Sequence, residues 1–158
     1  MNNTYKGLME VKINTKYHGE KEIEEKEVIT FVKPIPGFPD EEKFIVLPLD
    51  EEGSFFALQS IQNEQLAFVI SNPFLFFPDY DFNLEENAVE QLELASEKDV
   101  LVFAILTIQE PFDKTTANLQ APIIINQKKN LAKQVILNQT GYITKHLLFP
   151  NKKSVVKG

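Results

Sequence analysis

The sequence predicts a mainly β protein: a small antiparallel β-barrel-like domain with one short helix. Two observations lead to this prediction. Many short apolar and β-branched segments alternate with turn residues, which is the pattern of a small barrel or sandwich. One stretch, residues 83–97, instead repeats its apolar side chains at helical spacing.

The expected strands follow one another at short intervals. Residues 9–14 place Met9, Val11 and Ile13 on one face, because successive side chains of a strand alternate. Residues 100–108 (VLVFAILTI) are apolar at nearly every position and predict a central strand, apolar on both faces. The other expected strands cover residues 23–31, 44–49, 55–60, 66–71, 123–125, 134–137 and 142–148.

Turns separate these strands. Residues 34–38 (PIPGF) predict a turn in which two prolines restrict the backbone and Gly37 supplies the flexibility to reverse it. Residues 115–120 predict a polar turn in which Asn118 bonds to nearby backbone, and Pro122 then begins a strand where no N–H donor is needed. This segment holds no nucleophile, general base or metal ligand set, so it indicates shape rather than chemistry.

One helix is expected from about residue 83. Asn83 is the candidate N-cap, and Glu86, three residues later, completes a capping-box pattern. The apolar face would consist of Leu84, Ala88, Leu92 and Ala95. The opposite face would be an acidic stripe of Glu86, Glu90, Glu93 and Glu97. That stripe is either a solvated face or a docking face for a basic partner, and a helix ending at Leu92 would break it.

The charge is divided unevenly along the chain. Residues 1–113 hold 8 lysines and all 23 acids, a net charge of −15, whereas residues 114–158 hold 8 lysines and no acid. All 16 basic residues are Lys, so the chain lacks Arg, the residue that reads guanine and phosphate bidentately. We therefore expect no direct nucleic-acid binding, and an acidic body that meets a basic protein surface.

Composition sets further limits. The absence of Cys excludes a disulfide framework, thiolate chemistry and a Cys-based zinc site. The N-terminus lacks the apolar core of a signal peptide, and the longest apolar run is too short to span a bilayer. We expect a cytoplasmic protein that binds no membrane, with one domain over residues 1–150 and a basic, flexible tail at 151–158.

Residues 79–83 (DYDFN) place acids at positions 1 and 3 and an amide at position 5 of a calcium-binding loop pattern, and Glu90 falls at position 12. The motif requires Gly at its sixth position, where this chain has Leu84, and a preceding helix, which Pro73 and Pro78 prevent. The stretch is better interpreted as an acidic turn that leads into the helix.

Catalytic patterns are also weak. No Ser lies in a Gly-x-Ser-x-Gly turn, the six glycines are scattered singly, and there are two histidines, His18 and His146. A Ser/His/Asp triad assembled in space stays open, but we expect neither an enzyme nor a bound cofactor. The Phe-rich segment 74–77 is either core or an exposed patch that binds another protein.

Taken in order, short segments spread over about residues 9–148 resemble the FliW flagellar assembly factors of bacteria. They are residues 15–20 (TKYHGE), 29–31 (ITF), 35–38 (IPGF), 47–50 (LPLD), 55 and 58–60 (F and LQS), 67–70 (AFVI), 72–74 (NPF), 79–80 (DY), 99–100 (DV), 106–108 (LTI) and 116–126 (TANLQAPIIIN). One position departs from the family pattern: Pro34 stands where that pattern has Gly, and it should stiffen the turn before Ile35.

The resemblance implies a non-enzymatic protein that binds flagellin in the cytoplasm and also binds CsrA, a small RNA-binding repressor of flagellin translation. Flagellin export would then free the protein to sequester CsrA, so that translation resumes. From charge and expected exposure we predict an acidic docking surface of Asp79, Asp81, Glu85, Glu86 and Glu90. Polar contacts near it would be Tyr80, Asn118 and Gln120. We expect a monomer when free; the alternative is a small-ligand-binding or hydrolytic β-barrel with the Phe-rich segment lining a pocket.

Overall fold

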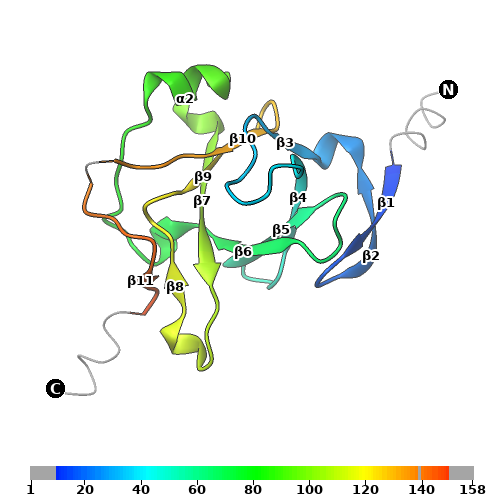
Figure 1. Ribbon diagram of the computed structural model, residues 1–158, viewed down its shortest axis with the longest axis horizontal. Helices are drawn as coiled ribbons and strands as arrows, with labels where there is room; N and C mark the ends of the chain where they lie inside the picture. The colour runs from blue at the N-terminus through cyan, green and yellow to red at the C-terminus, as the bar shows by residue number, and fades with distance from the viewer. Residues whose placement is uncertain (1–9, 139, 150–158) are drawn as a thin grey trace.

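The structure, a computed structural model, describes residues 10–138 and 140–149 (Figure 1). The expected tail at 151–158 and the first residue of the expected strand 9–14 lie outside these residues. The described chain forms a β-barrel, with a two-stranded hairpin on one side of it and a short helix, α2, on the other.

Seven strands close the barrel, because β7 pairs with both β6 and β9. Neighbouring strands are antiparallel except β10 and β3, which are parallel. The closed sheet confirms the expected mainly antiparallel barrel, and closure leaves no free sheet edge within the ring. The strands, in chain order, are β3 (Ile29–Phe31), β4 (Lys43–Pro48), β5 (Phe55–Ser60), β6 (Ala67–Ser71), β7 (Val100–Thr107), β9 (Ile123–Asn126) and β10 (Leu131–Gln134).

Further elements surround the ring. The hairpin consists of β1 (Glu10–Thr15) and β2 (Gly19–Glu24), and the strands β8 (Thr116–Ala117) and β11 (His146–Leu147) extend the sheet from β7. The described residues also form four 3-10 turns: η1 (Glu25–Glu27), η2 (Pro73–Leu75), η3 (Glu97–Asp99) and η4 (Phe112–Lys114). The α-helix α2 covers Glu86–Gln91. No helix within 10–138 or 140–149 is long and apolar enough to cross a membrane.

The core follows the alternation of each strand. One buried cluster takes side chains from all seven barrel strands, so it fills the barrel interior; it includes Phe44, Leu58 and Ile70. In β9, Ile123 and Ile125 belong to this interior, whereas Ile124 belongs to a second cluster beneath α2. The β-branched triplet is therefore buried on both faces of the sheet, and each such side chain contributes about 1.5–3 kcal/mol to folding.

Several expected strand bounds were wrong. The expected strand 23–31 is interrupted by η1, because the backbone N–H of Glu24 donates to the Glu27 carboxylate at 2.9 Å and turns the chain. The expected strand 134–137 lies earlier, at β10, and 142–148 contributes only the two residues of β11. The turn at 34–38 forms with Pro34 in place: Phe38 N–H donates to Ile35 O at 2.9 Å, and Gly37 has φ +92°.

The expected helix was also wrong in its start and its length. Its N-cap is Glu85 rather than Asn83, and its C-cap is Leu92. Leu92 is fully buried, and Glu93 follows with φ +54°, which ends the helix. The acidic stripe therefore does not exist: Glu93 lies past the helix and Glu97 belongs to η3. Glu93 also pairs with Lys129 at 2.9 Å.

Candidate functional site

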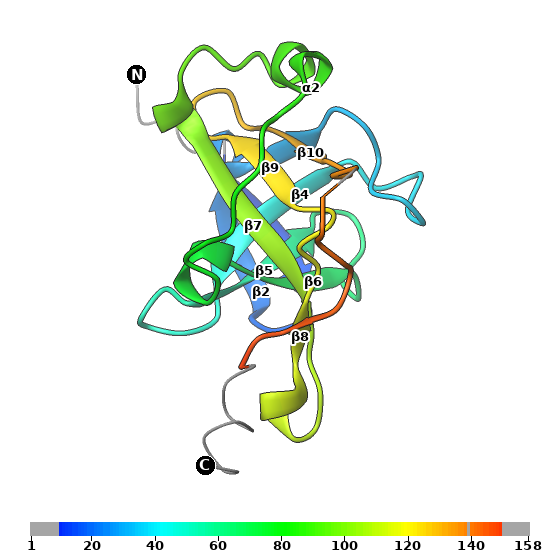
Figure 2. The same cartoon turned by 90° about the vertical axis from the view of Figure 1, so that its left-hand side faces the viewer.

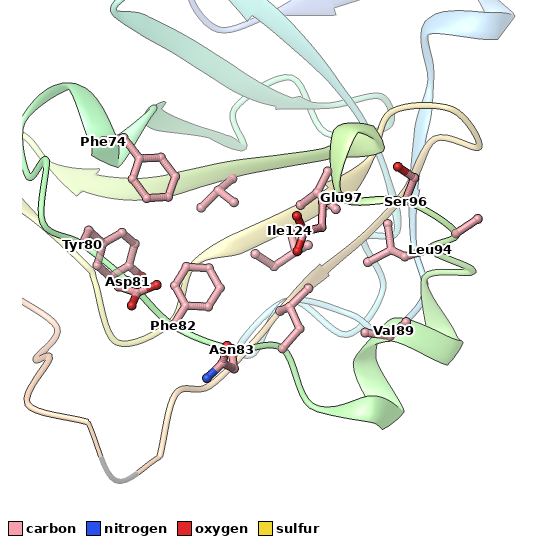
Figure 3. Close-up of a pocket in the computed structure, with 14 residues that line it drawn as sticks. Phe74, Tyr80, Asp81, Phe82, Asn83, Val89, Leu94, Ser96, Glu97 and Ile124 are labelled. Atoms are coloured by element: carbon pink, nitrogen blue, oxygen red, sulfur yellow. The ribbon is translucent and has the colours of Figure 1, made fainter.

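A cleft of about 730 Å³ opens on the outside of the barrel, beside α2 (Figure 3). One side is formed by strands β7 and β9, and the other by the chain before and after α2; Figure 2 shows the preceding chain passing over β7. We call this site the α2 cleft. Its lining residues are Phe74, Tyr80, Asp81, Phe82, Asn83, Leu84, Val89, Leu94, Ala95, Ser96, Glu97, Val100, Val102 and Ile124.

The α2 cleft is apolar in its floor and acidic at its rim. Val100 and Val102 of β7 are half-buried, because the cleft exposes the face on which they lie. β7 is apolar on both faces, as expected, but its outer face, which carries Val100 and Val102, is only partly covered. Two carboxylates, Asp81 and Glu97, lie among the lining residues, and both are exposed.

Tyr80 anchors the wall of the cleft. Its side chain is buried, and its hydroxyl donates to Leu119 O at 2.7 Å. Burial raises the pKa of Tyr80 well above its ordinary value, and Tyr142 raises it further, so the hydroxyl remains a neutral donor. The ring packs against Phe74 and Phe82, with centroids 5.7 and 5.2 Å away. Tyr80 therefore shapes the cleft from within and does not offer the exposed hydroxyl on which its prediction rested.

Tyr142 braces the Asp81 end of the cleft. Its ring lies 4.8 Å from that of Tyr80. Its hydroxyl accepts the Asp81 N–H at 3.0 Å and donates to Asp81 O at 3.1 Å. Because both backbone groups of Asp81 are held, its carboxylate is directed by a fixed backbone while remaining exposed.

The five predicted docking acids all lie on the surface near this cleft. Their side chains are exposed and form no ion pair with a described residue. One of them, Asp81, lines the cleft itself, and the others flank it along the chain or on α2. They are Asp79, Asp81, Glu85, Glu86 and Glu90. Glu90 sits on the helix, and Asp79 lies in a turn earlier in the chain. Within the described part of the chain, no His, Asp and Glu side chains gather into a metal-binding group.

Asn118 and Gln120 lie elsewhere. The Asn118 carboxamide accepts the backbone N–H groups of Gln120 at 3.1 Å and Ala121 at 3.0 Å, which is the turn-forming role expected for it. Gln120 N–H also donates to Ile143 O, and Gln120 O accepts from Leu137 N–H. Both residues are half-buried in a turn and do not line the cleft. Leu119, which lies between them, accepts the hydrogen bond of the cleft-lining Tyr80 hydroxyl.

Sequence reasoning missed most of the cleft lining. Phe82 and Leu84 are apolar residues that alternate with polar ones in the segment before α2. This alternation was overlooked because the helix was wrongly expected to begin at Asn83. Val89 was expected on neither helix face, and Glu97 was assigned to the acidic stripe. The β7 residues carried no signal, because a strand with one open face and a strand buried on both faces have the same apolar pattern.

The fold and the cleft define a class: a small closed β-barrel with a filled interior and an apolar, acid-rimmed cleft on its outer surface. A family model described as FliW protein matches residues 12–148. The chain therefore belongs to the FliW family, as its resemblance indicated.

Known relatives are similar over nearly their whole length. The flagellar assembly factor FliW of Bacillus licheniformis is 56% identical over 133 residues, which cover 84% of this chain and 93% of that protein. The flagellar assembly factor FliW of Geobacillus kaustophilus is 53% identical over 142 residues, covering 90% and 98%. A crystal structure of the flagellar assembly factor FliW superposes with a TM-score of 0.86 at 52% identity, covering 90% of this chain and 99% of the other.

Proposed function

We propose that this protein is a flagellar assembly factor that acts in the cytoplasm by binding other proteins and catalyses no reaction. Its partners are flagellin and a CsrA-type RNA-binding repressor of flagellin translation. Membership of the FliW family and the names of its relatives support the flagellar role. The two partners are those that the family resemblance implies, and the charge of the surface around the α2 cleft suits the second.

The observation that carries this proposal is the group of five exposed acids around an apolar cleft, none of which forms an ion pair with a described residue. An RNA-binding repressor needs a basic surface for its transcript, so an acidic surface would attract the repressor and repel the RNA. The apolar floor adds burial energy, about 25 cal/mol per Å² of apolar surface removed from water. The acidic residues would thus select a basic partner, and burial of apolar surface in the cleft would stabilise the complex.

The docking acids in this proposal remain Asp79, Asp81, Glu85, Glu86 and Glu90. The polar residues take a different part: Tyr80 positions the cleft wall, and the Asn118–Gln120 turn supports Tyr80 through Leu119. The alternative is a ligand-binding or hydrolytic barrel with the Phe-rich segment lining a pocket. Phe74 does line the α2 cleft, but side chains from all seven strands fill the barrel interior, which leaves no ligand cavity there.

Binding of a purified CsrA-type repressor by calorimetry, at low and high salt, tests the proposal. The double variant Glu86→Lys, Glu90→Lys should lose about tenfold or more in affinity at low salt, and less at high salt because ions screen exposed charges. The matched control is Glu51→Lys, Glu52→Lys, which makes the same charge change in the exposed β4–β5 turn, outside the cleft lining.

Equal losses in both variants would show that net charge alone drives binding. Unchanged binding in the first variant would remove α2 from the docking surface. A pull-down from a native lysate at low salt tests the partners themselves: failure to retain both flagellin and the repressor, with a small molecule co-purifying instead, would overturn the proposal.

A further inference from the structure

The α2 cleft carries charge at two places with apolar surface between them. Figure 3 shows Asp81 beside Tyr80, Glu97 beside Ser96, and the Phe82 ring between the two carboxylates. Neither carboxylate forms an ion pair with a described residue. The cleft therefore suits an extended segment with a basic residue at each end and small apolar side chains in the middle.

The described chain ends beside the segment 73–77, whose Phe74 lines this cleft. Its final residue, Phe149, packs against Phe76, with ring centroids 5.9 Å apart, and Phe76 is two residues from the cleft-lining Phe74. Seven residues before Phe149, the Tyr142 hydroxyl holds both backbone groups of Asp81. The nine residues 150–158 can span up to about 30 Å when extended.

Residues 150–158 (PNKKSVVKG) have the complementary order of side chains. Lys152 and Lys153 precede the apolar pair Val155–Val156, and Lys157 follows it. This segment also lies beyond residue 148, where the match to the family model ends, so the barrel fold does not require it.

We propose that the segment 150–158 docks into the α2 cleft of its own chain. Lys152 and Lys153 face Asp81, the valine pair covers the apolar floor, and Lys157 faces Glu97. The tether makes this an intramolecular contact at an effective concentration on the order of millimolar, so weak individual contacts suffice. The docked segment acts as a built-in competitor for whatever partner the cleft receives.

The absence of Cys makes the test direct. Ser154→Cys gives the chain a single thiol, to which a nitroxide spin label is attached, and the full-length protein is observed by ¹H–¹⁵N NMR. The expected result is loss of amide signal at Asp81, Phe82, Val89 and Glu97, reversed when the label is reduced. Adding Val155→Asp and Val156→Asp should restore these signals.

A label at Glu52→Cys, in the β4–β5 turn, is the matched control, and its pattern should be the same with and without the valine substitutions. Signal loss spread evenly over the surface would overturn the proposal. So would loss that persists when labelled, ¹⁴N protein is mixed with unlabelled, ¹⁵N protein, since the contact would then join two molecules. No flagellar partner is needed, so failure here leaves the proposed function untouched.

Discussion

Gln59 shows how one buried polar side chain joins separate parts of the fold. It is fully buried, and its carboxamide oxygen accepts the Lys16 N–H at 2.9 Å, at the tip of the β1–β2 hairpin. Its nitrogen lies 3.0–3.2 Å from four carbonyls of the β5–β6 region. The hairpin is thus tied to the barrel by hydrogen bonds as well as by apolar packing.

Gln59→Ala should therefore destabilise the protein by about 1–3 kcal/mol, because it leaves buried backbone groups without partners. Urea denaturation followed by circular dichroism measures the free energy of unfolding. Gln62→Ala, which truncates an exposed side chain in the same turn, should change it by less than about 0.5 kcal/mol. Similar effects for the two variants would argue against the role assigned to Gln59.

His146 makes stability depend on pH. Its Nε2 accepts the Ile143 N–H at 2.9 Å, and its ring packs against Phe77 and Tyr142. Burial lowers the pKa of His146 below its ordinary value, so the folded state favours the neutral ring. This contribution to stability is present above the unfolded-state pKa of about 6.5 and is lost as the pH falls through the folded-state pKa.

Urea denaturation between pH 5 and pH 8, as a rough experimental window around the histidine pKa, tests this sign. His146→Asn should cost more stability at the upper end of the window than at the lower end, since the protonated wild-type ring can no longer accept the Ile143 N–H. A difference between wild type and variant that is constant, or that grows on acidification, would contradict the assignment.

At the scale of elements, Asn126 holds the C-terminal end of α2 against the barrel. Its amide nitrogen donates to Leu92 O at 2.8 Å and lies 3.2 Å from Glu93 O. Its oxygen accepts the N–H groups of Lys128 and Lys129 in the β9–β10 turn. The Asn126 side chain is 2% exposed, so its hydrogen bonds are shielded from water.

Asn126→Ala should therefore speed amide hydrogen exchange in residues 86–94 and lower the free energy of unfolding by about 1–3 kcal/mol. Exchange in β4 and β5, on the other side of the barrel, should change only as far as global stability does. Asn138→Ala, at an exposed position, is the control. Uniformly faster exchange, with nothing specific to α2, would show that Asn126 does not anchor this helix.

Elements with a local cause were predictable from the sequence. The strand at 55–60 has the expected bounds, and Asn118 forms the expected turn, because alternation and side chain-to-backbone bonds act over a few residues. The helix was misplaced because the capping pattern at Asn83 is local, whereas tertiary contacts at Leu92 and Asn126 decide where α2 lies and ends. The cleft could not be foreseen, since it joins segments that only the closed barrel brings together.

At the scale of the whole molecule, the barrel interior is filled, so binding belongs to the outer surface. On this surface, the acidic and basic parts of the sequence lie next to each other. The basic last third of the chain supplies β9 and β10, which lie close to the acidic segment that carries α2. Two contacts already join them: Lys129 to Glu93 at 2.9 Å, and Lys133 to Gln91 at 2.6 Å. Residues 150–158 continue this basic composition, with three further lysines.

If that segment competes with a basic partner, neutralising its charge should tighten partner binding. The triple variant Lys152→Gln, Lys153→Gln, Lys157→Gln should lower the apparent Kd of a CsrA-type repressor roughly threefold if the segment fills the cleft about two-thirds of the time. Calorimetry at a fixed salt concentration measures the change.

Removing three positive charges would by itself attract a basic partner, so the control must make the same change elsewhere. Lys12→Gln, Lys21→Gln, Lys43→Gln does so at exposed positions on β1, β2 and β4, outside the cleft lining. Competition predicts a clearly larger gain in affinity for the tail variant than for this control, because only the tail variant frees the cleft. Equal gains would assign the effect to long-range charge and would remove the segment 150–158 from the regulation of the cleft.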